Sequence, residues 1–294
     1  MVDITARRGS YASPLRYPGG KATLAGFFES TIKALGLDRP TYIEPYAGGA
    51  GAGLELLLKD VVGNVVINDL DPAIHACWKS MVKDSEEFLR LLKRTPLSIE
   101  EWKKQRDIYR RRHDADVDPL ALGFATFYLN RTSRSGVLGA GVIGGLAQAG
   151  PYKLDARFDK DALRCRIEKL AELSGKIRIT KQDGAARLRE YLPKDNTFAY
   201  VDPPYVEKGS SLYMSAFQEW DHVELARVLN GHSNTNWVLT YDVSELIKSL
   251  YKARELSPFT LLYSAHLRGN RGELKRPSAT ELMVLSNPVA DALR

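Results

Sequence analysis

Short apolar runs alternate with segments of helical hydrophobic spacing over most of the chain. The apolar runs, which predict buried strands, are 41–44, 64–68, 176–180, 198–201 and 236–241. Helical spacing is found at 22–35, from 54, from 72, at 184–191, at 221–229 and at 243–250. Strands that alternate with helices are typical of a mostly parallel sheet with helices on both of its faces. The pattern therefore predicts an α/β fold, and two late strands are expected on either side of a loop at 266–277.

The alternation stops between residues 86 and 173, where the hydrophobic spacing is helical only. Charges crowd residues 103–112, which are open to two interpretations, a solvated helix face or a phosphate-facing surface. A segment rich in Arg, Asn, Ser and Thr follows at 128–136, and glycines are frequent from there to residue 150. We interpret 86–173 as a mainly helical insert with a hairpin loop, and residues 1–85 together with 174–294 as the sheet domain.

The composition is that of a globular protein with a mild excess of positive charge. The 294 residues carry a net charge of +6, which suggests an anionic partner without identifying it. No apolar run approaches the roughly 20 residues of a membrane helix. Residues 1–8 lack the apolar core of a signal peptide, so we expect a cytoplasmic location without a membrane partner. Cys77 and Cys165 form no CxxC motif, which favours reduced thiols over a metal site.

A glycine turn follows the first predicted strand, as Pro45-Tyr46-Ala47-Gly48-Gly49-Ala50-Gly51-Ala52-Gly53. A strand, a glycine turn and a helix form the ligand-cradling unit of an open α/β sheet. No G-x-G-x-x-G register fits, which argues against a dinucleotide and favours a nucleoside-type ligand without a pyrophosphate. Gly19-Gly20-Lys21 also fails the P-loop motif, because Leu15 and Ala22 stand where that motif needs a glycine and a hydroxyl residue. Lys21 could still neutralise a carboxylate.

Acidic residues stand at three strand ends, where ligands bind in such sheets. Asp69 could accept hydrogen bonds from ribose hydroxyls, and Asp183 could accept one from an adenine amino group. Asp202 begins the stretch Asp202-Pro203-Pro204-Tyr205, whose prolines hold the peptide carbonyls rigidly just past a buried strand. Taken alone, this stretch is more typical of an ordinary strand-ending turn. The other strand ends are what point to a ligand here.

Two segments carry the side chains that contact phosphates and base edges in nucleic acids. One lies in the insert, and the other is the loop at 266–277, where glycines separate basic residues. The candidate DNA-binding residues are Asn130, Arg131, Ser133, Arg134, Arg268, Arg271 and Lys275.

The joint order of these motifs resembles the Dam-type family of DNA adenine methyltransferases, over segments 16–21, 44–53, 68–69, 129–131, 202–205 and 281–287. The resemblance implies a Rossmann-like methyltransferase sheet that binds S-adenosyl-L-methionine, a target-recognition insert, double-stranded DNA as partner and no metal. Whether a cognate restriction endonuclease acts separately beside it stays open. The implied cofactor-binding residues are Tyr17, Lys21, Glu44, Tyr46, Gly48, Gly49, Gly51, Asp69, Asp183 and Asp202. The implied catalytic residues are Asp202, Pro203, Pro204 and Tyr205.

Two departures from the family pattern concern the first cofactor loop and the insert. Glu44-Pro45-Tyr46 stands where Asp-Pro-Phe is more usual, a change that leaves the role of the loop intact. The insert is less similar to the best-known members, so their target sequence does not carry over to this chain.

The implied reaction is methyl transfer to the N6 amino group of an adenine flipped out of duplex DNA at specific sites. Asp202 and the Pro203 carbonyl would accept both amino hydrogens and free the nitrogen lone pair, while Tyr205 would stack on the base. One alternative is an amino-methyltransferase that acts on cytosine in DNA or adenine in RNA. A second is a DNA-binding protein without activity, against which the intact 202–205 motif and Lys21 argue. The glycine register argues against a nicotinamide enzyme.

Overall fold

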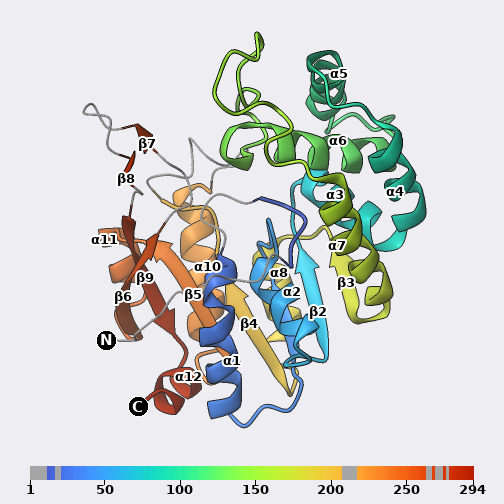
Figure 1. Ribbon diagram of the computed structural model, residues 1–294. Helices are drawn as coiled ribbons and strands as arrows, with labels where there is room; N and C mark the ends of the chain where they lie inside the picture. The colour runs from blue at the N-terminus through green and yellow to red at the C-terminus, as the bar shows by residue number, and fades with distance from the viewer. Residues whose placement is uncertain (1–11, 17–20, 207–216, 263–266, 269–273, 276–277) are drawn as a thin grey trace.

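The computed structural model of the chain describes residues 12–16, 21–206, 217–262, 267–268, 274–275 and 278–294. A seven-stranded sheet at its centre has the strand order β3-β2-β1-β4-β5-β9-β6 (Figure 1). These strands are β1 Thr41–Glu44, β2 Asn64–Asn68, β3 Ile177–Thr180, β4 Thr197–Val201, β5 Trp237–Asp242, β6 Glu255–Leu262 and β9 Ser278–Leu285. The first five are parallel, and β9 runs antiparallel between β5 and β6. The predicted α/β sheet is confirmed.

The strand order reverses between β1 and β4, which lie side by side although two strands separate them in the chain. Loops that leave neighbouring strands toward opposite sides of a sheet create a crevice at the carboxyl ends. The glycine turn leaves β1 at this point and the Asp-Pro-Pro-Tyr stretch leaves β4. The topology therefore brings the two motifs together.

Both faces of the sheet are covered by helices, because the side chains of each strand alternate between two hydrophobic clusters. Tyr42 packs with α1 Ala25–Ala34, α2 Gly51–Leu58, α3 Pro72–Lys83 and α12 Asn287–Ala292. Its neighbour Ile43 packs on the opposite side with α8 Gly184–Tyr191, α10 Glu219–Gly231 and α11 Glu245–Leu250. The expected helices on both faces are confirmed, with ends that differ from the predicted ones by a few residues.

The largest difference at a helix end concerns the glycine turn, where α2 begins at Gly51 rather than at the expected residue 54. A short 3-10 helix, η1 Lys21–Leu24, packs closely on this end of α2. A Cβ atom on Gly51 would lie 3.0 Å from the Ala22 Cβ, so the contact favours glycine. This packing brings the segment that carries Lys21 to the end of β1.

The segment 86–173, which we interpret as an insert, is mainly helical and is seen at the top and right of Figure 1. Its elements are α4 Ser85–Arg94, α5 Ile99–Arg110, α6 Pro119–Thr132, η2 Arg134–Gly136 and α7 Lys160–Glu172, and η3 Ser174–Lys176 leads back to the sheet. Ser133 and Val142 form an antiparallel bridge, so the expected hairpin loop is present. No described helix is long and apolar enough to cross a membrane.

The insert shares its core with the sheet domain. One hydrophobic cluster joins Phe28 and Tyr42 of the sheet domain to Phe88 and Phe124 of the insert. Helix α3 packs so closely on α6 that a Cβ atom on Gly123 would lie 2.6 Å from the Ala76 carbonyl oxygen. The predicted start of the insert at residue 86 falls inside α4, and the division into two domains stays a prediction.

The chain between β6 and β9 is more elaborate than the predicted loop. Two short strands, β7 Leu267–Arg268 and β8 Leu274–Lys275, pair as an antiparallel hairpin. The backbones of the candidate DNA-binding residues Arg268 and Lys275 therefore lie on adjacent strands. Arg271 and the candidate cofactor-binding residue Tyr17 lie outside the described residues.

Candidate active site

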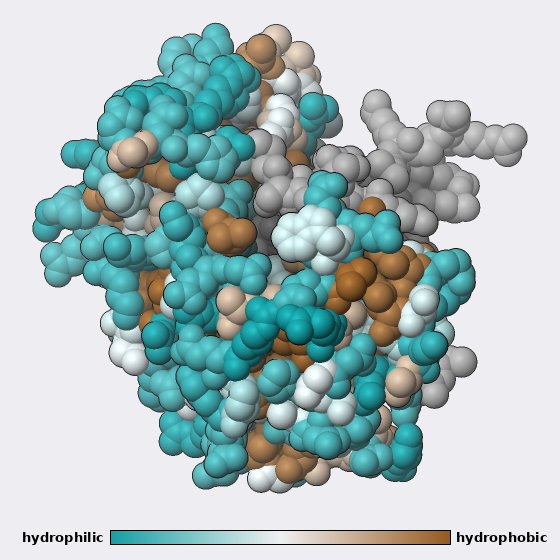
Figure 2. All heavy atoms as spheres, turned by 180° about the vertical axis from the view of Figure 1, so that it is seen from behind, coloured by the Kyte–Doolittle hydropathy of each residue, from teal (hydrophilic) through white to brown (hydrophobic). Residues whose placement is uncertain are grey.

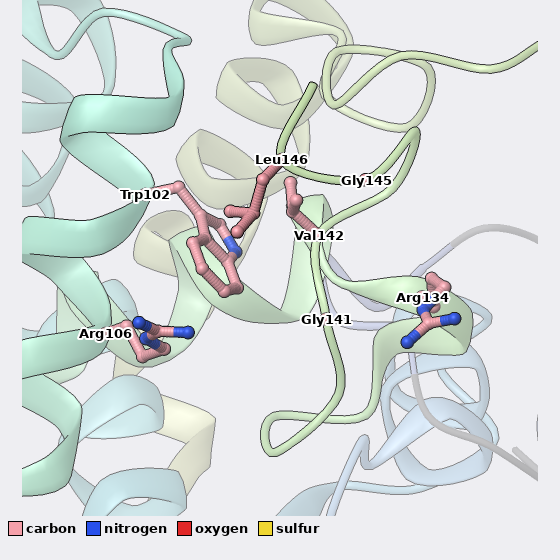
Figure 3. Close-up of a pocket in the computed structure, with 7 residues that line it drawn as sticks. All are labelled: Trp102, Arg106, Arg134, Gly141, Val142, Gly145 and Leu146. Atoms are coloured by element: carbon pink, nitrogen blue, oxygen red, sulfur yellow. The ribbon is translucent and has the colours of Figure 1, made fainter. Parts of the chain in front are cut away.

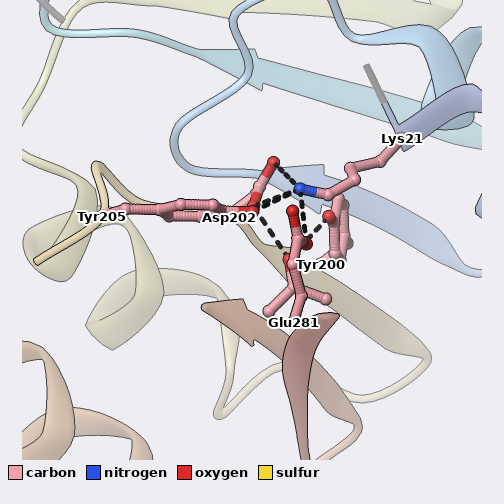
Figure 4. Close-up of polar contacts among 6 residues, drawn as sticks. Lys21, Tyr200, Asp202, Tyr205 and Glu281 are labelled. Atoms are coloured by element: carbon pink, nitrogen blue, oxygen red, sulfur yellow. Dashed lines mark hydrogen bonds and ion pairs between the residues drawn. The ribbon is translucent and has the colours of Figure 1, made fainter. Parts of the chain in front are cut away.

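Lys21 lies at the centre of a buried polar cluster at the end of β4 (Figure 4). Its Nζ lies 3.1 Å and 3.2 Å from the two Asp202 carboxylate oxygens and 3.1 Å from Glu281 Oε2. The same Nζ donates a hydrogen bond of 2.5 Å to the Tyr205 hydroxyl. The structure thus brings together Lys21, Asp202 and Tyr205, which the sequence analysis proposed from separate motifs.

Asp202 is held by a second set of contacts from the neighbouring strand β5. Thr240 Oγ1 donates a 2.8 Å hydrogen bond to Asp202 Oδ1, and the Tyr200 hydroxyl lies 2.8 Å from Thr240 Oγ1. The Tyr205 hydroxyl lies 3.3 Å from the same carboxylate oxygen. The Asp202 side chain nevertheless keeps 22% of its surface exposed, against 6% for Lys21. This carboxylate is therefore fixed in orientation and still open to a ligand.

Among the described residues of the cluster, the Lys21 ammonium faces the carboxylates of Asp202 and Glu281. Burial opposes the charge of Lys21, but Asp202 and Glu281 together raise the pKa of its ammonium above the ordinary value. Charged groups this deeply buried are retained only with close partners. The arrangement can hold a cationic ligand near Asp202, because this carboxylate stays partly exposed.

Glu44 fixes the end of the glycine turn from inside the protein. Its Oε1 accepts a 2.9 Å hydrogen bond from the Gly53 peptide N–H. Burial raises the pKa of Glu44 to about 8, although that hydrogen bond opposes the rise. Trp78 Nε1 donates a 2.8 Å bond to the Gly48 carbonyl, and Gly48 has a φ of 46°, which glycine adopts most easily. The turn is shaped by these contacts before any ligand binds.

Asp69 connects the glycine turn to the end of β2. One carboxylate oxygen accepts a 3.0 Å hydrogen bond from the Gly48 N–H and the other accepts one of 3.0 Å from the Asp71 N–H. Burial raises the pKa of Asp69 to about 7. Each carboxylate oxygen can accept more than one hydrogen bond, so ribose binding by Asp69 is compatible with these contacts and stays a prediction.

Tyr46 and Asp183 come together beside the end of β3. A Cβ atom on Gly184 would lie 2.3 Å from the Tyr46 ring, so this ring rests directly on the peptide that follows Asp183. Phe217 meets the Tyr46 ring edge-on, with 5.4 Å between the ring centres. Asp183 caps α8 by accepting a 2.8 Å hydrogen bond from the Ala186 N–H, and it lies at an exposed edge.

Asn130, a candidate DNA-binding residue, is buried and hydrogen-bonded to protein backbone. Its Oδ1 accepts from the Arg16 N–H at 2.7 Å, and its Nδ2 donates to the carbonyls of Arg16 at 2.6 Å and Gly136 at 3.0 Å. Ser133 is also buried, at the base of the hairpin loop. In this structure both residues position the hairpin loop and the segment before Lys21, and direct DNA contact by them stays a prediction.

Arg134 lies at an open pocket between the hairpin loop and α5 (Figure 3). The pocket has a volume of about 290 Å³. It is lined by Trp102, Arg106, Arg134, Gly141, Val142, Gly145 and Leu146. The Arg106 guanidinium lies over the Trp102 ring, 4.5 Å from its centre, and the Leu146 side chain is 60% exposed. Two guanidiniums therefore lie beside a largely apolar wall.

Two other basic residues of α5 and the turn after it are paired within the insert. Arg110 pairs with Asp107 at 3.2 Å, and Arg111 pairs with Asp114 and Asp116 at 3.0 Å and 2.7 Å. The outward-facing side of the insert is predominantly hydrophilic (Figure 2). These exposed pairs favour the solvated helix face over a phosphate-facing surface for this part of 103–112.

Four residues around Asp202 were not proposed as site residues from the sequence, namely Tyr200, Thr240, Asp242 and Glu281. Asp242 lies at the end of β5, directly opposite Glu281 on β9, and accepts a 3.1 Å hydrogen bond from the Val206 N–H. Glu281 had two signals in the sequence, because it opens the segment 281–287 that carries the family resemblance and directly precedes the apolar run 282–285. Such a residue indicates a buried partner but does not identify it.

An open α/β sheet with a glycine turn after β1 and an Asp-Pro-Pro-Tyr turn after β4 defines the class of the protein as an α/β methyltransferase. The chain belongs to the D12 class N6 adenine-specific DNA methyltransferase family, whose family model matches residues 17–269. The predicted enzyme class and the predicted methylation of adenine N6 in DNA are thereby confirmed.

Individual relatives are more distant. The chain is 26% identical over 218 residues to the Type II methyltransferase M.MjaIII of Methanocaldococcus jannaschii, with 70% of this chain and 73% of the relative covered. A putative RNA methyltransferase from Pyrococcus horikoshii matches with a TM-score of 0.40 and 9% identity, over 96% of this chain and 92% of that one. The rRNA methyltransferase aviRa of Streptomyces viridochromogenes matches with a TM-score of 0.35 and 15% identity, over 99% and 93%.

Proposed function

We propose that this protein is a Dam-type member of its family, which transfers a methyl group from S-adenosyl-L-methionine to the N6 amino group of an adenine flipped out of duplex DNA. The observation that carries the proposal is the Asp202 carboxylate. It is fixed by Lys21 and Thr240 at the carboxyl end of β4 and remains partly exposed in the crevice. The rigid Pro203 carbonyl follows it directly.

The cofactor would lie along the carboxyl ends of β1, β2 and β3. The glycine turn allows close approach of a ligand, Asp69 offers acceptors for ribose hydroxyls, and Asp183 lies beside the Tyr46 ring on the adenine side. When bound, S-adenosyl-L-methionine supplies an electrophilic methyl group on a sulfonium. The partly exposed Asp202 carboxylate suits that cation.

The protein groups would act on the adenine amino nitrogen, whose lone pair is delocalised into the ring. Asp202 and the Pro203 carbonyl accept the two amino hydrogens and favour a tetrahedral nitrogen that can attack. Lys21, Thr240 and the Tyr205 hydroxyl keep the carboxylate in place. After the methyl group is transferred, the nitrogen carries a surplus proton, which Asp202 can accept at its exposed side.

Duplex DNA would be held by the insert and by the β7–β8 hairpin. Extrusion of the target base costs a few kcal/mol, which contacts to the distorted strand must offset. The pocket beside Arg134 offers guanidiniums and an aromatic ring for this purpose. Tyr205 is buried against Lys21 in this structure, so base stacking by its ring requires a rearrangement. By analogy with the Type II methyltransferase relative, we also propose that a separately acting restriction endonuclease is a functional partner of this protein.

The proposal is tested by identifying the methylated nucleoside. The protein is incubated with labelled S-adenosyl-L-methionine and either mixed-sequence duplex DNA or RNA of matched base composition, and the products are digested to nucleosides and analysed by mass. We expect N6-methyladenine from duplex DNA and no label in RNA. N4-methylcytosine or labelled RNA would contradict the proposed substrate. DNA binding without any methyl transfer would show an inactive homologue.

A further inference from the structure

Four arginines from distant parts of the chain converge around the segment 12–16, and we call them the arginine cluster. They are Arg16, Arg131, Arg157 and Arg166. Arg16 Nη1 donates to the Ser133 carbonyl at 3.4 Å, and Arg166 Nη1 donates to the Ser13 carbonyl at 3.3 Å. The Asn130 side chain bonds to both backbone groups of Arg16, which places Arg16 beside the helix turn that carries Arg131.

Three members of the arginine cluster are not neutralised by a carboxylate. No carboxylate of the described residues forms an ion pair with Arg16, Arg131 or Arg157, in contrast to the paired arginines elsewhere in the insert. Arg131 Nε is buried and has no hydrogen-bond partner among the described residues. Burial and the charges of the other three arginines lower the pKa of Arg131 to about 9, opposed by the charge of Asp159.

The arginine cluster is also open to an external ligand. Arg157 is exposed, and the other three side chains are half-buried. Planar guanidiniums offer paired donors that match phosphate oxygens, so several of them close together can bind a phosphate. An unpaired buried donor such as Arg131 Nε is a feature that a bound acceptor would satisfy.

The position of the arginine cluster limits the choice of anion. Arg16 precedes Lys21 by five residues, so its Cα lies at most about 18 Å from that of Lys21 along a fully extended chain. The methyl donor carries a carboxylate but no phosphate, whereas duplex DNA presents phosphates along its whole length. Resting on the proposed function, we infer that the arginine cluster binds a backbone phosphate of the DNA strand beside the target adenine.

A phosphate bound at the arginine cluster would also link two parts of the chain. Three of its arginines belong to the insert and one to the segment that leads to Lys21, so a bound phosphate joins the recognition insert to the catalytic segment. Without the phosphate the four guanidiniums repel one another. Removal of one guanidinium should therefore weaken DNA binding without weakening the free protein.

The test compares Arg157→Gln and Arg166→Gln with Arg227→Gln, an exposed α10 arginine paired with Glu224, as the matched control. Affinity for a mixed-sequence duplex is measured by fluorescence anisotropy at several salt concentrations between about 50 and 200 mM. We expect each cluster variant to bind about tenfold more weakly, as when a bond to a charged group is removed. The slope of log K against log salt should fall by about 0.9 for each phosphate that the variant no longer binds. The control should match the wild type.

Two further measurements separate the alternatives. Calorimetry should give unchanged affinity for S-adenosyl-L-methionine, and the Tm of the free cluster variants should be unchanged or higher. The inference is overturned by control-like DNA affinity and slope, by loss of cofactor affinity with an unchanged slope, or by a lower Tm that accounts for the weaker binding. If the wild type methylates DNA and the cluster variants have the same slope of log K against log salt as the wild type, only this inference fails and the proposed function stands. If the wild type neither methylates nor binds DNA, the proposed function fails.

Discussion

Replacement of Lys21 by methionine tests whether the buried ion cluster holds the site together. Methionine has a similar length and is apolar, so the change removes the ammonium with little change of volume. It leaves Asp202 and Glu281 facing each other without the cation that lies 3.1 Å from each. Glu281 is 1% exposed and cannot turn to solvent.

The size of the effect follows from this burial. Removal of one partner from a buried ion pair costs about 3–5 kcal/mol of unfolding free energy, because the remaining charge stays desolvated. A second substitution, Glu281→Gln, removes one of the two carboxylate charges that Lys21 no longer faces, while it keeps the shape of the side chain. The double variant should therefore be more stable than Lys21→Met alone, by about 0.5–3 kcal/mol, which is the size of coupling between groups in one network.

Urea unfolding of the four proteins of this double-mutant cycle at pH 7 gives the free energies directly. Lys33→Met, at an exposed position of α1, is the matched control and should stay close to the wild type. The reasoning is refuted if Lys21→Met lies within about 1 kcal/mol of the wild type, or if Glu281→Gln makes the Lys21→Met protein less stable rather than more.

Three further changes give separate tests. The pKa of Glu44 is raised by burial from 4.5 to about 8, so the folded protein binds the extra proton and its stability falls as the pH rises from about 4.5 through 8. Glu44→Gln should reduce this loss of unfolding free energy with rising pH, as measured by urea unfolding at several pH values. An unchanged dependence on pH would contradict the role of Glu44. Gly184→Ala should lower the unfolding free energy by about 1–3 kcal/mol in the same assay, because the new methyl group would overlap the Tyr46 ring. Gly26→Ala is the control and should not lower it, because a Cβ atom there meets nothing within 4 Å. Thr240→Val removes the 2.8 Å bond to Asp202 and should lower kcat by roughly 10- to 100-fold with cofactor affinity kept; a normal kcat would contradict its positioning role.

The strands could be predicted from the sequence because each is a local feature. The residues of β4 are all buried, and a short run that is apolar on both faces predicts a central parallel strand wherever it occurs. The insertion of β9 between β5 and β6 could not be predicted, because an antiparallel pairing depends on contacts between segments that the local pattern does not describe. The same limit applies to η1, whose place is set by packing against α2.

The site was predictable where residue chemistry allows one role and not where it allows several. Lys21 and Asp202 were proposed from separate motifs, and their contact follows from the reversal of strand order at β1 and β4. Asn130 has the same amide whether it bonds to a base or to a peptide, and only its burial shows that it holds Arg16. Glu281 gave a weaker signal still, because its partner lies at the other end of the chain.

Methyl transfer by Asp202→Ala is the most direct test of the central claim. The variant is first shown to be folded and to bind S-adenosyl-L-methionine, with Asp195→Ala, an exposed acid, as the matched control. Single-turnover transfer of labelled methyl to duplex DNA is then measured at saturating enzyme. We predict a loss of at least about 100-fold for Asp202→Ala and a normal rate for the control. A folded, cofactor-binding Asp202→Ala protein that methylates adenine in duplex DNA at the wild-type rate would contradict the assignment of Asp202 as the catalytic carboxylate.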